Sequence, residues 1–150
     1  MKRFGLYSVV TFAVAVVVTA GVAIATPGVG AVSTVLASRH MTAFKVLNTD
    51  ANVVVARNTY DVGGNSGWHS HPGKVIIAVE SGEITLYRGD DATCTGTTHA
   101  AGEIFVEKPG VVYLGRNEST TTQAVLIATF FNVGDAGARI DQLDPGNCTF

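Results

Sequence analysis

The residues best suited to chemistry in this sequence are His69 and His71, which a single residue separates. A neutral imidazole offers one ring-nitrogen lone pair and is the commonest side-chain metal ligand in proteins. Successive side chains of a β-strand point to opposite faces, so a strand would direct both imidazoles to the same side. Two such rings can converge on one ion, or they can line a pocket for an organic molecule. Two protein ligands alone hold a metal weakly, since catalytic zinc sites use three, and both alternatives stay open.

The elements that must position the two histidines are predicted to be β-strands. Pro72-Gly73 is a turn signal, and the apolar run 75–79 follows it directly. The longest apolar strand is expected within 120–131, and 31–39 is expected as a first edge strand. Seventeen glycines, with many valines and threonines, are typical of an all-β chain with frequent turns. Short strands at nearly regular spacing favour a sandwich or a barrel.

The spacing of glycines around the histidines resembles the two sequence motifs of the cupin family. The matching positions are Gly63, His69, His71, Gly82, Gly102, Gly110 and Asn117. The resemblance covers roughly residues 42–133. It implies an all-β, cupin-like double-stranded β-helix, also called a jelly-roll barrel, with a pocket inside it.

Two positions depart from the family pattern. Cupins usually bind a metal through two histidines and a glutamate of the first motif and one histidine of the second. Val75 stands at the glutamate position and Tyr113 at the second-motif histidine position. The implied ligands of a divalent ion of unknown identity therefore reduce to His69 and His71, with Val75 and Tyr113 as pocket residues. We expect Tyr113 to fill the barrel and form a hydrogen bond, the alternative being a phenolate ligand to a hard cation.

Residues 1–25 are typical of an export signal. Lys2 and Arg3 precede an uncharged apolar stretch, and Ala23-Ile24-Ala25 places small residues where a signal peptidase cleaves. Cleavage would release an exported protein, secreted or in the cell envelope. The alternative is an uncleaved apolar helix that acts as a single-pass membrane anchor, because about twenty apolar residues suffice to span a bilayer.

The two cysteines, Cys94 and Cys148, are predicted to form a disulfide, as expected for an even number in an exported chain. The bridge would tie a polar tail, 134–150, to a loop of the barrel. The mature chain, 26–150, is then a single domain with its core at about 42–133.

Charge and motifs limit the functions to be considered. The net charge is −2 and the basic residues are scattered, so nucleic acid is not expected as a partner. No Ser-His-Asp set, phosphate loop or cysteine nucleophile is recognisable.

The leading hypothesis is a small-molecule binder with or without a weakly held metal. The alternatives are a metal-dependent cupin-type enzyme, such as a dioxygenase or isomerase, and a structural or oligomerising envelope protein. Cupins often pair, so a homodimer is also expected.

Overall fold

A computed structural model describes residues 25–44, 49–133 and 137–150. Within these ranges all the regular elements are β-strands and there is no helix, which confirms the all-β prediction. The strands are β1 (Val29–Phe44), β2 (Thr49–Asn65), β3 (His69–Ser70), β4 (Val75–Ser81), β5 (Glu83–Arg88), β6 (Thr97–Ala100), β7 (Ile104–Glu107), β8 (Tyr113–Arg116), β9 (Ala124–Phe131) and β10 (Ile140–Asp141).

The predicted signal peptide or anchor, with its apolar helix, lies outside the described residues except for its last position. Among the residues that the structure does describe, no helix is long and apolar enough to cross a membrane.

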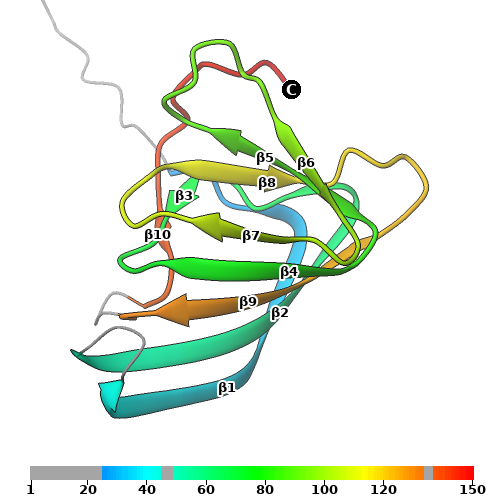
Figure 1. Ribbon diagram of the computed structural model, residues 1–150. Coiled ribbons are helices and arrows are strands. Elements are labelled where there is room, and N and C mark those ends of the chain that lie inside the picture. Colours follow the sequence, from blue (N-terminus) through cyan, green and yellow to red (C-terminus); the bar gives the residue numbers. More distant parts are fainter. Residues whose placement is uncertain (1–24, 45–48, 134–136) are drawn as a thin grey trace, which may run out of the picture.

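The strands form a nearly closed antiparallel barrel (Figure 1). One wall has the strand order β1-β2-β9-β4-β7, and the other has the order β10-β3-β8-β5-β6. The walls join where Asn65, the last residue of β2, pairs with Arg116 of β8. This path brings β3 and β7, which are distant in sequence, to the same interior.

The interior is apolar because alternate residues of the central strands face it. Val75, Ile77 and Val79 of β4 are buried, and β9 buries alternate residues in the same way. Ile77 pairs with Ala128 across the β4–β9 ladder, so the two buried rows share one face. The predicted long apolar strand at 120–131 is thus β9.

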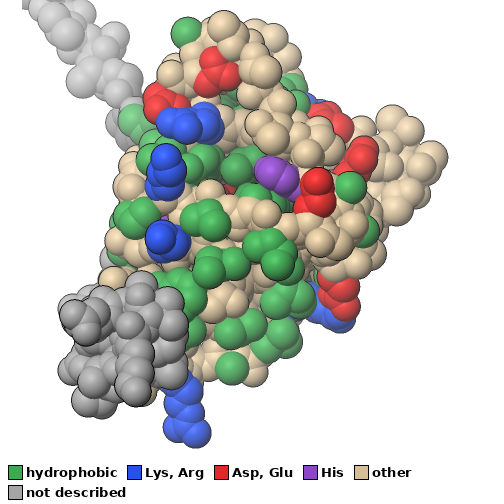
Figure 2. Space-filling view, viewed as in Figure 1, with side chains coloured by type: hydrophobic (Ala, Val, Ile, Leu, Met, Phe, Trp, Pro, Cys, Tyr) green, Lys and Arg blue, Asp and Glu red, His purple; other side chains and the backbone are tan. Residues whose placement is uncertain are grey.

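The outer face of the same wall also carries apolar side chains. Ile76 and Val106 are a cross-strand pair of β4 and β7, and both are exposed, as is Ile104. Figure 2 shows hydrophobic side chains gathered over β4, β7 and β9 on the face seen there. The strand predicted at 31–39 lies within β1, which pairs with β2.

The C-terminal tail packs back on the barrel. Cys94 and Cys148 form the predicted disulfide, and the Phe150 ring lies on Tyr87 with ring centroids 4.9 Å apart. Further back in the tail, β10 pairs with β3. The tail therefore lies beside the strand that carries His69.

Candidate metal centre

His69 lies in β3, and His71 follows Ser70, the last residue of that strand. His69 and His71 are both buried, with 6% and 4% of their surface exposed. Their ring centroids are 4.8 Å apart, with the rings nearly perpendicular. Because they are separated by one residue in an extended segment, both side chains project to the same side.

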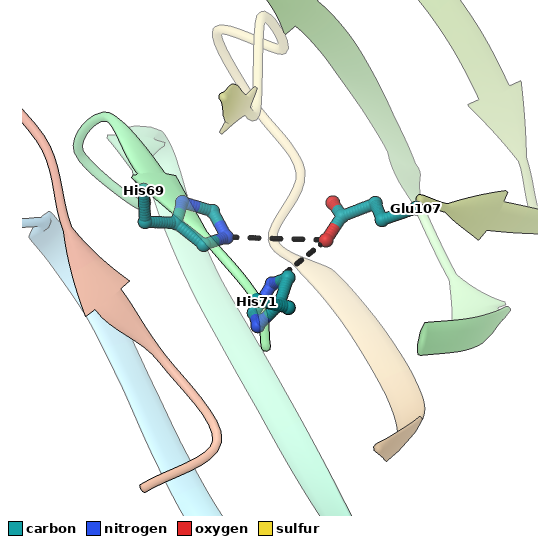
Figure 3. Close-up of side chains that lie close together, drawn as sticks. All are labelled: His69, His71 and Glu107. Carbon is teal, nitrogen blue, oxygen red and sulfur yellow. Dashed lines mark ion pairs between the residues drawn. The ribbon is translucent and has the colours of Figure 1, made fainter. Parts of the chain in front are cut away.

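A third group, the carboxylate of Glu107 at the end of β7, meets the two imidazoles (Figure 3). Its Oε2 atom lies 2.8 Å from Nε2 of His71 and 4.0 Å from Nε2 of His69. One ligand atom from each of the three residues lies within 4.8 Å of the others, and all three residues are buried. The arrangement is a set of two nitrogen donors and one oxygen donor around a common point.

Sequence reasoning missed Glu107, because the first cupin motif places its carboxylate on the histidine-bearing segment. A signal was nevertheless present. If 104–107 is a strand, Glu107 lies on the same face as Phe105, and a charged residue on an apolar face points to a partner inside.

The other nitrogen of each imidazole is tied to the backbone. Nδ1 of His69 lies 3.0 Å from the carbonyl oxygen of Gly67, and Nδ1 of His71 lies 2.5 Å from that of Ala138. A carbonyl only accepts, so each Nδ1 carries the hydrogen, and in the neutral ring Nε2 keeps its lone pair. Metal-binding histidines are commonly oriented by such a contact.

These tautomers leave Glu107 Oε2 facing two lone pairs. With a neutral His71 the 2.8 Å approach is not a hydrogen bond, and Oε2 has no hydrogen-bond partner among the described residues. A buried carboxylate oxygen without a partner is unfavourable. A cation between the three ligand atoms, or a second proton on His71, removes the repulsion. The residues present therefore fit a metal ion.

The electrostatics of His69 favour the form that binds a metal. Burial lowers the pKa of His69 to about 4; the carboxylate of Glu107 opposes this shift, and Arg139 and His71 add to it. At neutral pH the ring is therefore uncharged and its Nε2 lone pair is available.

Beside the three residues lies a cavity of about 310 Å³, at the lower end of the range of ligand pockets. Its lining includes His69, His71 and Glu107, and most of the rest is apolar. The apolar lining includes Ile77, Ile84, Leu86, Phe105, Leu126 and Phe130.

The structure places the two predicted pocket residues in the barrel wall. Val75 is 1% exposed and belongs to the hydrophobic core. Tyr113 is buried opposite His69 in the β3–β8 pairing, and its hydroxyl accepts a hydrogen bond from the backbone N–H of Lys108 at 3.3 Å. Neither is among the residues that line the cavity.

Comparison with known proteins agrees with this architecture. The family model of the cupin domain matches residues 56–130, half of the chain. The chain belongs to the cupin family. A search of curated proteins finds no match.

Several solved structures share the fold. A cupin-like protein from Thermotoga maritima is 19% identical, with a TM-score of 0.57 over 76% of this chain and 77% of the other. A cupin domain from Bordetella pertussis is 20% identical, with a TM-score of 0.54 over 72% and 97%. A double-stranded β-helix protein from Klebsiella pneumoniae is 23% identical, with a TM-score of 0.53 over 74% and 83%.

Proposed function

We propose that this cupin holds a divalent metal ion on His69, His71 and Glu107 and binds a small organic molecule in the adjoining cavity. The observation that carries the proposal is the convergence of two oriented Nε2 atoms on an otherwise unpaired carboxylate oxygen, all in a buried site. The family motifs place metal ligands at positions 75 and 113, where this chain has Val75 and Tyr113. Glu107 would then supply the third ligand.

The number of ligands supports a role in binding rather than in structure alone. Structural zinc sites use four protein ligands, whereas three leave a position for water or a substrate. Here the three donors lie on the wall of the cavity, so a bound molecule would lie next to the ion. A metal in this position would act as a Lewis acid toward an oxygen atom of that molecule. The chain's own residues hold the ion and surround the molecule with apolar side chains.

A metal-dependent enzyme of the dioxygenase or isomerase type is the second candidate. The same set of two histidines and one carboxylate is used by non-haem iron oxygenases and, with zinc, by hydrolases. Turnover separates the two candidates, because a binding protein returns its ligand unchanged. Incubation of the iron-loaded or zinc-loaded protein with a bound molecule, followed by mass analysis of that molecule, is the direct test.

Calorimetric titration with zinc, manganese, nickel and ferrous iron tests the metal centre. Wild type should bind at least one of them with one ion per chain. Glu107→Gln keeps the size of the side chain but removes its charge, and it should weaken binding strongly. If none of the four ions binds to wild type, or if Glu107→Gln binds as tightly as wild type, the proposal is wrong.

The location and the assembly of the protein remain predictions. The Cys94–Cys148 disulfide supports export to an oxidising compartment. Homodimer formation has support in the exposed apolar side chains of β1, where Val32, Val35 and Leu36 are 57–65% exposed. Sedimentation analysis of the mature chain measures the assembly directly, and a monomer at all concentrations would contradict the homodimer.

A further inference from the structure

Arg139 lies on the wall of the same cavity, beside the metal centre. In the pairing of β10 with β3, Ile140 lies opposite Ser70 and Asp141 lies opposite His69. Arg139 comes one residue earlier and therefore runs alongside His71. The contact between Ala138 and the His71 ring holds this segment in place.

The guanidinium group of Arg139 is bonded to the protein through Nε, and its terminal nitrogens are left for a ligand. Its Nε donates a hydrogen bond to Oδ1 of Asp141 at 2.6 Å, and the side chain is 34% exposed. Its two terminal nitrogens have no acceptor among the described residues. A guanidinium edge with two parallel N–H groups matches the two oxygens of a carboxylate. Arg139 can therefore bind the carboxylate group of a ligand at the rim of the cavity.

A second polar group on the cavity wall is the hydroxyl of Tyr60. Tyr60 is 8% exposed, and its hydroxyl has no hydrogen-bond partner in the described part of the chain. Burial, and after it the charge of Glu107, raises the pKa of Tyr60, which keeps the hydroxyl protonated. Tyr60 can therefore donate a hydrogen bond to an oxygen atom inside the cavity.

The net charge around the cavity determines whether an anionic or a cationic ligand binds more favourably. A divalent ion on two neutral histidines and Glu107 leaves a net positive charge, to which Arg139 adds. Asp141, which is not on the cavity wall, offsets part of it at the rim. A monoanion balances this field, and an amine is repelled by it. A compact dianion such as phosphate would need more donors than one guanidinium edge provides.

We propose that the ligand of the cavity is a small organic acid whose carboxylate pairs with Arg139 at the rim and whose hydrocarbon body lies on the apolar wall formed by Ile77, Phe105, Leu126 and Phe130. The inference rests on the proposed function for the bound ion, which makes the charge around the cavity positive and lies next to the acid.

The test compares 3-phenylpropionate with its uncharged amide on zinc-loaded protein by calorimetric titration. The acid should bind at least about tenfold more tightly than the amide, because the amide loses the charge-assisted pairing. Arg139→Gln should weaken binding of the acid and so remove most of this preference, and Arg139→Lys should retain part of it. Arg88→Gln is the matched control, since Arg88 also pairs with an aspartate two residues on, at the surface, and it should change nothing.

Zinc affinity, measured on the same samples, distinguishes a failure of this inference from a failure of the proposed metal centre. If zinc binds to wild type and to Arg139→Gln alike, and wild type does not prefer the acid, the inference is overturned and the metal centre stands. If wild type binds no zinc, the metal centre fails, and the same acid and amide titrations on chelator-treated protein still test Arg139. An equal preference for the acid in wild type and Arg139→Gln would also overturn the inference.

Discussion

Glu107 lies directly opposite Val75 in the antiparallel ladder of β4 and β7. Side chains of such a pair stand on the same face of the sheet, with Cβ atoms about 5 Å apart. The carboxylate that the first cupin motif places at position 75 is therefore present in the site, but it comes from the neighbouring strand. Val75 contributes to the hydrophobic core instead.

Exchanging these two side chains tests whether the carboxylate ligand comes from Glu107 in place of position 75. Glu107→Val should lower metal affinity by at least about 100-fold, the upper end of what the loss of an outer partner of a metal ligand costs. The double variant Val75→Glu/Glu107→Val returns a carboxylate to the same face from the opposite strand. Calorimetric titration with zinc should show that it recovers much of the loss. A double variant that binds no better than Glu107→Val would contradict the geometry.

Removal of either imidazole should abolish detectable metal binding, because one histidine and one carboxylate are too few ligands to retain an ion. His69→Ala and His71→Ala are the test variants, with metal content after dialysis as the measurement. His40→Ala is the control, since His40 is exposed on β1 and bonds to Asn52. Retention of metal by either test variant would show that the ion is held elsewhere.

The stability of the metal-free protein should fall in acid through His69. Its folded-state pKa of about 4 lies below the ordinary value of 6.5, so between these values the unfolded chain binds the extra proton and the folded chain does not. The contribution of His69 is therefore full above about pH 6.5 and is lost as the pH falls toward 4, by up to about 3 kcal/mol. Urea unfolding of chelator-treated protein at pH 7.5 and pH 4.5 measures it. His69→Gln should lose less stability than wild type over this interval, and equal losses would count against the shifted pKa.

The disulfide should be a major contributor to stability. Reduction of Cys94–Cys148, or its replacement by two serines, should lower the free energy of unfolding by up to about 4 kcal/mol, because the bridge closes a long loop of the unfolded chain. Thermal unfolding with and without a reductant measures the effect in wild type. The double serine variant should unfold at the same temperature in both conditions. A wild-type midpoint that the reductant leaves unchanged would contradict this prediction.

Local patterns in the sequence were enough to predict the architecture. Alternating apolar residues, glycine turns and the spacing around His69 and His71 indicate strands and a cupin barrel, because side-chain direction in a strand repeats every two residues. The disulfide was also predictable, since the two cysteines of a chain with a predicted export signal have only each other as partners. The signal peptide predicted at residues 1–25 lies outside the described residues except for its last position, so it stays a prediction.

The chemistry of the site depended on pairing between distant segments, which the tertiary structure alone decides. Glu107 becomes a ligand candidate because β7 pairs with β4 in the register that sets it opposite Val75. Ala138 orients His71, and Arg139 reaches the cavity, because β10 returns to pair with β3. Each contact joins residues more than thirty positions apart, and no periodicity within one segment specifies which partner strand lies beside it. The sequence by itself determined a histidine pair on one face of a barrel; the register of two ladders decided which carboxylate and which arginine meet it.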